Sequence, residues 1–201
     1  MITSKKINTK LDRDFYLRPT LEVAVDLLGK YLVYDNNGQI ISVRIVEVEA
    51  YIGEDDPACH AAVGRTSRNE IMYGVGGFSY VYFIYGMYHC LNIVTEQEGY
   101  PAAILIRGAE PVDGIELMQK NYPKTKGGKF TNGPGKLCKA LRLTREKNGL
   151  DLTGNCVYLE DRRYNVNRIK KTGRIGIKKA VNRKWRFYDA DSDSVSIREK
   201  K

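Results

Sequence analysis

The sequence lacks several patterns that would assign the protein to a particular class. Its four cysteines, Cys59, Cys90, Cys138 and Cys156, are scattered and form no Cys-x-x-Cys pair, which argues against a zinc knuckle or a redox motif. No run of about 18 apolar residues predicts a membrane span, and residues 1–18 lack the apolar core of a secretion signal. We therefore expect a cytoplasmic protein without a metal site, whose cysteines are small core residues.

Positive charge is what the sequence has in excess. Among 201 residues, Lys and Arg number 33 and Asp and Glu 24, so the net charge is +9, and 42% of the residues are hydrophobic. This hydrophobic fraction is enough for the chain to build its own core. A basic surface favours a polyanionic partner, nucleic acid before anionic membrane, although a basic protein with no such partner has the same composition.

The charge is also unevenly distributed along the chain. Residues 118–145 contain eight Lys or Arg and no acid, and residues 162–186 contain eleven and no acid. Residues 46–64 contain five acids and no Lys or Arg. A solvated charged face is the usual explanation of one such block. Basic flanks around an acidic and aromatic centre are more typical of polyanion binding with carboxylate chemistry in the middle.

The hydrophobic pattern predicts an α+β fold. We expect a single mixed domain at residues 17–201, around a curved antiparallel sheet, after a short N-terminal tail at residues 1–16. Thr20 is expected to cap a helix that ends at Gly29, and Asn36-Asn37-Gly38 is typical of a hairpin turn. The other expected elements are strands at 31–34, 40–51, 80–85, 88–94 and 102–109, and helices at 112–119 and 136–143.

Residues 46–51 (VEVEAY) combine carboxylates with alternating apolar residues. Strand alternation places Glu47, Glu49 and Tyr51 on one face, and Val46 with the other apolar residues on the opposite, core face. Two carboxylates on one face of a strand that ends at a loop are typical either of a solvated edge or of an acid/base site. These residues alone leave both interpretations open.

Residues 80–88 (YVYFIYGMY) place aromatic side chains around an expected hairpin bend. Hairpin tips usually carry Asn, Gly, Asp or Ser, whereas this tip carries Tyr85, Met87 and Tyr88 around one glycine. Large side chains at a bend are well placed to protrude, and a protruding aromatic β-hairpin on a basic protein can wedge into a DNA duplex. The alternative is a core strand pair with buried side chains, which we expect for Phe83 and Ile84 but not for Tyr85.

Two further features are weaker. His60, one of two histidines, lies in a loop of Gly, Ala and acidic residues soon after Glu49, a setting that favours a site-lining role over that of an ordinary polar histidine. His89 has no such setting and is interpreted as structural. The run GPGK at 133–136 opens an expected helix whose free N–H groups could hold a phosphate, but Leu137 stands where a P-loop needs Ser or Thr.

Five runs of residues carry a family resemblance. They are VEVEAYIGEDDPACHA (46–61), RTSRNEIMYG (65–74), YVYFIYGMYHCLNIV (80–94), ILIRGAEP (104–111) and GPGKLCKAL (133–141). In order and with similar spacing, they resemble the alkyladenine (3-methyladenine) DNA glycosylases. The resemblance extends from about Leu17 to 174–176 and 185–188, and so covers most of the chain.

The resemblance implies a monofunctional DNA glycosylase of base excision repair. Such an enzyme flips a damaged purine, alkylated or deaminated, out of double-stranded DNA and hydrolyses its N-glycosidic bond. The resemblance also implies a monomer that uses no metal ion and no organic cofactor. Such a protein is expected to lie with the chromosome, at the nucleoid if the source is bacterial.

The resemblance also implies roles for individual residues. Glu49 matches the general base that activates water, and Arg107 matches the residue that helps to hold this carboxylate and the water. Asn92 matches the residue that rejects guanine through its exocyclic amino group. The pocket that stacks on the flipped base corresponds to Tyr51, His60 and Tyr82. The side chain that fills the gap in the duplex, and its two neighbours in the minor groove, correspond to Tyr85, Met87 and Tyr88.

Some residues depart from the family pattern or have no role assigned by it. Val75 and Gly76 stand where prolines are common in the family, and Cys59 stands where another small residue is common. Glu47 is interpreted as a structural hydrogen-bonding residue. Two other functions remain open: an O-glycoside hydrolase that uses Glu47 and Glu49 as its carboxylate pair, and a non-enzymatic DNA-bending module with Tyr85 as its wedge.

Overall fold

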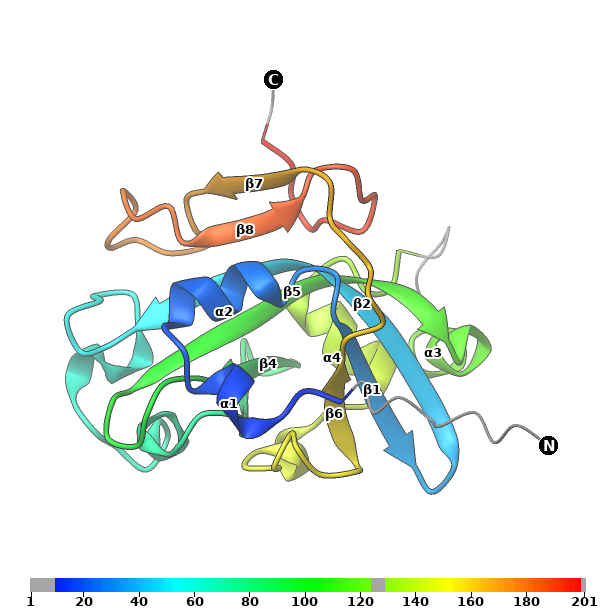
Figure 1. Ribbon diagram of the computed structural model, residues 1–201, viewed down its shortest axis with the longest axis horizontal. Helices are drawn as coiled ribbons and strands as arrows, with labels where there is room; N and C mark the ends of the chain where they lie inside the picture. Colours follow the sequence, from blue (N-terminus) through cyan, green and yellow to red (C-terminus); the bar gives the residue numbers. More distant parts are fainter. Residues whose placement is uncertain (1–9, 124–128, 200–201) are drawn as a thin grey trace.

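The computed structural model describes residues 10–123 and 129–199. Its strands pair into one curled antiparallel sheet in the order β3-β4-β5-β2-β1-β6, with β8 paired to β2 and β7 to β8 (Figure 1). The strands are β1 (Tyr31–Asn36), β2 (Gln39–Ile52), β3 (Ser79–Ile84), β4 (Tyr88–Val94), β5 (Ala102–Asp113), β6 (Val157–Glu160), β7 (Ile169–Thr172) and β8 (Arg186–Asp189). The predicted α+β domain with an antiparallel sheet is therefore confirmed.

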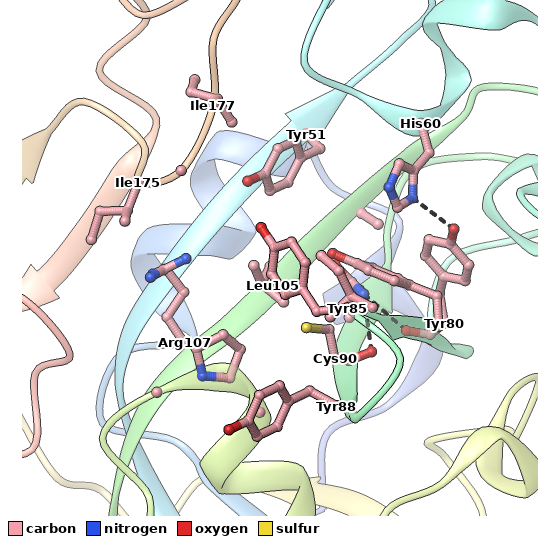
Figure 2. Close-up of a pocket in the computed structure, with 18 of the residues that line it drawn as sticks. Tyr51, His60, Tyr80, Tyr85, Tyr88, Cys90, Leu105, Arg107, Ile175 and Ile177 are labelled. Atoms are coloured by element: carbon pink, nitrogen blue, oxygen red, sulfur yellow. Dashed lines mark hydrogen bonds between the residues drawn. The ribbon is translucent and has the colours of Figure 1, made fainter.

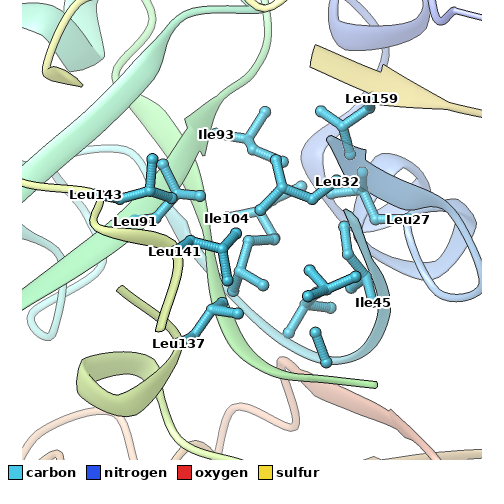
Figure 3. Packing of buried hydrophobic residues seen from close by; sticks show 14 of the residues in the cluster. Leu27, Leu32, Ile45, Leu91, Ile93, Ile104, Leu137, Leu141, Leu143 and Leu159 are labelled. Carbon is cyan, nitrogen blue, oxygen red and sulfur yellow. The ribbon is translucent and has the colours of Figure 1, made fainter. Parts of the chain in front are cut away.

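Helices pack against this sheet and close the core. They are α1 (Arg13–Tyr16), α2 (Thr20–Asp26), α3 (Ile115–Asn121) and α4 (Pro134–Leu141), with short 3-10 turns η1 (His60–Val63), η2 (Glu70–Tyr73) and η4 (Arg145–Lys147). Leu137 and Leu141 of α4 meet Ile93 and Ile104 of the sheet in the main cluster (Figure 3). Because α4 is anchored by this apolar face, its N-terminal end is held at a fixed place beside β4.

The long strand β2 changes its partner half-way along one edge. Residues 39–44 pair with β1 and residues 47–49 pair with β8, and a register shift against β5 separates Ile45 from Glu47. A bulge of this kind puts two successive residues on one side of the sheet. The expectation that Val46 shares the main core face is therefore wrong. Val46 packs in a separate cluster with Tyr188, Ala190 and Val195.

Three element boundaries also differ from the sequence-based predictions. Thr20 is the first helical residue rather than the cap, which is Pro19, and its hydroxyl instead donates to Glu96 Oε1. Residues 112–113 still belong to β5, because Gly114, with φ 72°, is what turns the chain into α3. Helix α4 begins two residues before the expected start, since Pro134 occupies its first turn, where a missing N–H costs nothing.

Part of the expected N-terminal tail packs with the domain. Residues 13–16 form α1, and the Tyr16 side chain is fully buried in the main cluster; residues 1–9 lie outside the described residues. Gly76 lies against this helix, and a Cβ atom there would stand 2.7 Å from the carbonyl oxygen of Tyr16. This contact is a physical reason for glycine where prolines are common in the family.

Candidate active site

A cavity of about 510 Å³ opens between the sheet, the β3–β4 hairpin and the N-terminal end of α4 (Figure 2). Its volume falls within the range of about 300–1,000 Å³ that is usual for small-molecule sites. The lining is mostly apolar and aromatic, with few polar side chains, as such sites require. Its lining includes Tyr51, His60, Tyr80, Tyr82, Tyr85, Tyr88, Asn92, Arg107, Lys136 and Ile175.

Glu49 lies directly behind the wall of this cavity. Its side chain is fully buried, and its three hydrogen-bond donors all come from residues that line the cavity. The Tyr51 hydroxyl donates to Oε2 over 2.8 Å, and Arg107 Nη1 donates to the same oxygen over 3.3 Å. The backbone N–H of Ile175 donates to Oε1 over 2.6 Å. The carboxylate is thus held in one orientation beside the cavity.

The surroundings of Glu49 adjust its proton affinity. Burial raises the pKa of Glu49 above its ordinary value, and the charge of Glu47 raises it further, while Arg107, the Ile175 N–H and the Tyr51 hydroxyl lower the pKa. Burial is the largest of these effects. A desolvated carboxylate that is still partly neutralised by a guanidinium has the properties of a general base.

Arg107 bridges the two glutamates predicted on this face of β2. Its Nε donates to Glu47 Oε1 and its Nη1 donates to Glu49 Oε2, each over 3.3 Å. In the part of the chain that the structure describes, neither glutamate lines the cavity, whereas Arg107 does. The two carboxylates differ in their other donors: Tyr51 and Ile175, which bind Glu49, line the described cavity, and Arg186 and Ser196, which bind Glu47, do not.

Aromatic rings form one end of the cavity. His60, at the start of η1, meets the Tyr82 ring edge-on, with 4.6 Å between the ring centroids, and its Nδ1 shares a 2.8 Å hydrogen bond with the Tyr80 hydroxyl (Figure 2). Burial lowers the pKa of His60 to about 4, so the imidazole is neutral at physiological pH. The structure brings Tyr51, His60 and Tyr82 to this one cavity, as the sequence predicted.

Asn92 lies on β4 at the base of the aromatic end. Its side chain is buried, and its amide nitrogen donates to the carbonyl oxygen of Tyr80 over 3.0 Å. Because the nitrogen is engaged with the neighbouring strand, the amide oxygen is the atom left to meet a molecule in the cavity. An acceptor there attracts a ligand N–H and offers nothing to a ligand carbonyl.

The bend between β3 and β4 carries the three residues matched to the DNA wedge. Tyr85 is 78% exposed and Met87 57% exposed, and Tyr85 has φ 53°, a left-handed conformation that is uncommon for an aromatic residue. Tyr88 is only half exposed, with Lys139 Nζ 4.4 Å from its ring centroid. A Cβ atom at Gly135 would stand 2.7 Å from the Tyr88 ring, so glycine permits α4 to approach the hairpin this closely.

Comparison with known proteins decides the family. Residues 14–193 match the family described as methylpurine-DNA glycosylase (MPG). The chain is 53% identical over 193 residues to a protein of Methanocella arvoryzae, covering 94% of this chain and 96% of that protein. The chain belongs to the methylpurine-DNA glycosylase family. It is therefore a hydrolase of N-glycosyl bonds that acts on DNA in base excision repair.

Relatives in other organisms are similar over equally long stretches. A protein of Alkaliphilus oremlandii is 48% identical over 199 residues, which is 93% of this chain and 98% of that protein. A Wolbachia protein is 53% identical over 183 residues, which is 90% of this chain and 97% of that protein. These two proteins and that of Methanocella arvoryzae bear the provisional name 3-methyladenine DNA glycosylase.

The glycosylase site also contains residues that the sequence-based reasoning missed. Arg174 is buried and binds both carboxylate oxygens of Asp56, and it donates to the carbonyl oxygen of Ala50 over 2.9 Å. The Arg174 guanidinium lies 4.7 Å from the centroid of the Tyr51 ring. The motif at 174–176 was part of the resemblance, but nothing in one sequence pairs Arg174 with an aspartate more than a hundred residues away.

The basic block at residues 162–186 separates into two kinds of residue in this glycosylase. Five of its arginines bind acidic side chains of the same chain: Arg162, Arg168, Arg174, Arg183 and Arg186. Five of its lysines are exposed: Lys170, Lys171, Lys178, Lys179 and Lys184. These lysines, together with the exposed Arg163, can meet an external anion. No helix among the described residues is long and apolar enough to cross a membrane.

Proposed function

We propose that this glycosylase removes alkylated purines, 3-methyladenine among them, from double-stranded DNA by hydrolysis. The observation that carries the proposal is a buried carboxylate, Glu49, held by Arg107, Tyr51 and the Ile175 N–H at the wall of an aromatic cavity. A carboxylate in this position can take a proton from water. It can also stabilise the positive charge that develops on deoxyribose as the purine leaves.

The cavity supplies the binding chemistry that the reaction requires. Alkylated purines are electron-poor or cationic rings, and the faces of Tyr51 and Tyr82 attract such rings. The neutral imidazole of His60 adds no competing positive charge. The oxygen of Asn92 repels ring positions that carry a carbonyl, and the bulk of this buried side chain is proposed to exclude the added amino group of guanine. These contacts together favour a damaged adenine over an intact guanine.

The target base has to leave the duplex to reach this cavity. We propose that it flips out and that Tyr85 enters the space it vacates, with Met87 and Tyr88 beside it in the minor groove. The exposed bend supports this role, since Tyr85 lines the mouth of the cavity and is also 78% exposed. Positive charge on Lys178, Lys179 and neighbouring lysines supplies sequence-independent attraction to phosphates.

The proposed enzyme is monofunctional and acts as a monomer, in the compartment that holds the chromosome. Water is its nucleophile, because the group positioned as the base is a carboxylate and not an amine able to form a Schiff base. In the described part of the chain, no three His, Cys, Asp or Glu side chains gather where they could hold a metal ion. We therefore expect excision to persist after exhaustive treatment with EDTA; loss of activity that a divalent metal restores would contradict this.

A base-release assay over a small panel of lesions tests the proposal. The panel contains 3-methyladenine, 7-methylguanine, hypoxanthine and ethenoadenine in matched duplexes, together with each lesion in a single strand. We expect release of 3-methyladenine, faster from the duplex, and release of hypoxanthine if deaminated purines are also substrates. Absence of release from every duplex would contradict the proposal, and sedimentation of the enzyme alone tests whether it is a monomer.

The two alternative functions fit the structure less well. An O-glycoside hydrolase with Glu47 and Glu49 as its pair would need both carboxylates at the substrate. Glu47 instead accepts hydrogen bonds from Arg186 and Ser196, which do not line the described cavity, and Arg107 stands between it and the cavity. A DNA-bending module without catalysis would have no use for Glu49 and its three donors beside a cavity.

A further inference from the structure

Glu47 is the most heavily engaged carboxylate near the site. It accepts from Arg186 Nε over 2.7 Å, from the Ser196 N–H over 2.6 Å, from the Ser196 hydroxyl over 2.8 Å and from Arg107 Nε over 3.3 Å. Its side chain has no exposed surface. A fully buried charge with four donors is costly to assemble, and breaking such an arrangement on one side leaves other charges unpaired.

The engagement of Glu47 determines which atoms of Arg107 face Glu49. A guanidinium is planar, so fixing its Nε and one Nη atom fixes the direction of the others. Glu47 holds Nε, and the Ser196 hydroxyl lies 3.4 Å from Nη2. Nη1 is the atom that remains for Glu49 Oε2. Glu47 and Ser196, neither of which lines the described cavity, thus determine the orientation of Arg107 at the cavity wall.

The segment that carries Ser196 fits closely onto this cluster. A Cβ atom at Gly108 of β5 would stand 2.6 Å from the carbonyl oxygen of Ser194 and 3.1 Å from Glu47 Oε2, so only glycine leaves room for the segment. Val195 is buried against β8, and the carbonyl oxygen of Ile197 accepts from Arg186 Nη2. The match to the family ends at residue 193, so these contacts come from residues beyond it.

We infer that Glu47 is a positioning residue which, together with Ser196, directs Arg107 toward Glu49 and thereby sets the geometry of the general base. This inference rests on the proposed function of Glu49. Glu47 does not line the cavity formed by the described residues, so it acts on the site through Arg107 and through its charge. The segment at residues 194–197 therefore belongs to the site, because Ser196 contacts both Glu47 and Arg107.

Charge as well as geometry is affected by Glu47. Glu47 and Glu49 face Arg107 and Arg186, two negative charges against two positive ones. The ionisable groups around Glu49 are Glu47 and Tyr51 from β2, Cys90 from β4, Arg107 from β5, Arg186 from β8 and Arg174 after β7. Glu47→Gln removes a negative neighbour, which lowers the pKa of Glu49, and it also frees Arg107, whose displacement raises that pKa.

The test is single-turnover base release as a function of pH, on one alkylated duplex, with DNA affinity measured beside it. We expect Glu47→Gln to lower the plateau rate by roughly 10²-fold, the cost of displacing a catalytic group by about 1 Å, with DNA affinity unchanged. Its acid limb moves away from the wild-type pH, because Glu47→Gln changes both the charge beside Glu49 and the position of Arg107, which lowers the pKa of Glu49. A residue that only stabilised the fold would change the folded fraction and leave the acid limb in place.

Asp189→Asn is the matched control. Asp189 is also a buried carboxylate, on the neighbouring strand β8. Its Oδ2 lies 3.6 Å from Arg44 Nη1, so its ion pair is with Arg44 instead of Arg107. We expect Asp189→Asn to lose stability while the rate per folded molecule and the acid limb stay as in the wild type. A folded Glu47→Gln variant with the wild-type plateau and an unmoved acid limb would overturn the inference.

If Glu47→Gln does not fold, Ser196→Ala tests the inference in its place. Ser196→Ala removes only the hydroxyl that contacts Glu47 and Arg107. We expect it to fold and to slow base release with unchanged DNA affinity; release at the wild-type rate would overturn the inference. Failure of the proposed function gives a different result, since the wild-type enzyme itself would then release no base.

Discussion

The backbone N–H of Ile175 donates a 2.6 Å hydrogen bond to Oε1 of Glu49, and this bond joins two segments that are 126 residues apart. Its donor is positioned by the preceding residue, Arg174, which is bound by both oxygens of Asp56. The loop of Asp56 and the segment after β7 therefore meet behind β2, and Glu49, the proposed general base, lies where they meet.

We expect Asp56→Asn to destabilise the protein strongly. It would leave the Arg174 charge buried without its partner, a change that costs about 3–5 kcal/mol. The exposed pair of Arg168 and Asp191 provides the control, since Asp191→Asn should cost about 1 kcal/mol or less. Urea unfolding measures both. Equal, small losses would mean that the Arg174 pair does not hold the segment in place.

Much of the fold could be predicted from the sequence, because its signals are local. Alternating Ile and Val in β2 and the aromatic run around Gly86 identify strands by their own residues, and the three strands β2, β3 and β4 are found there. The boundaries that were missed depend on partners: Thr20 turns toward Glu96 instead of capping its helix. Val46 leaves the main core because β8, far along the chain, pairs at the bulge.

The site was predictable to the extent that its residues lie in motifs. Glu49, Tyr51 and Arg107 belong to runs that resemble a family, and the structure brings them together at one cavity. Phe83 was expected in the core but is 47% exposed, since it pairs only with β4 in a part of the hairpin that lies beyond the pairing of β4 with β5. The contacts of Arg174 and Ser196 join segments more than a hundred residues apart, and no local pattern encodes such a pair.

Tyr85→Ala should impair capture of the flipped base. Filling the vacated stack offsets an unstacking cost of a few kcal/mol, which is smaller when the lesion is mispaired. We therefore expect a larger loss of excision on well-paired lesions than on mismatched ones. Phe83→Ala is the control, because Phe83 is a partly exposed aromatic of the same hairpin that does not line the described cavity. Equal losses on both substrates would make Tyr85 only structural.

Borohydride added during turnover should trap no enzyme–DNA adduct. The group positioned beside the cavity as the base is a carboxylate, and it forms no reducible imine with the sugar. Lys136 is the amine that makes this test informative, since it lines the cavity with its Nζ 2.9 Å from Asn132 Oδ1. A trapped adduct that disappears in Lys136→Gln would refute the monofunctional mechanism and identify the nucleophile.

The rate of excision should decline as the pH is lowered, with an apparent pKa above 4.5, the ordinary value for a glutamate. Glu49 works only when ionised. Because burial raises its pKa, Glu49 is protonated, and lost as a base, at a higher pH than an ordinary glutamate. His60, whose pKa is lowered to about 4, stays neutral through this range. The acid limb should therefore persist at the same pH in His60→Gln. A limb that moves with this substitution would assign it to the imidazole.

Glu49→Gln tests the central claim most directly. Glutamine keeps the size and one acceptor oxygen but cannot take a proton from water or place negative charge beside the sugar, a loss of roughly 10²–10⁴-fold from general-base catalysis alone. DNA affinity rests on lysines, the aromatic cavity and the wedge, and all of these remain. Single-turnover base release and a binding titration at one salt concentration should give near-normal or tighter binding with excision close to background. If Glu49→Gln retains about a tenth of wild-type excision, which is less loss than removal of a general base causes, Glu49 is not the base and the mechanism is wrong.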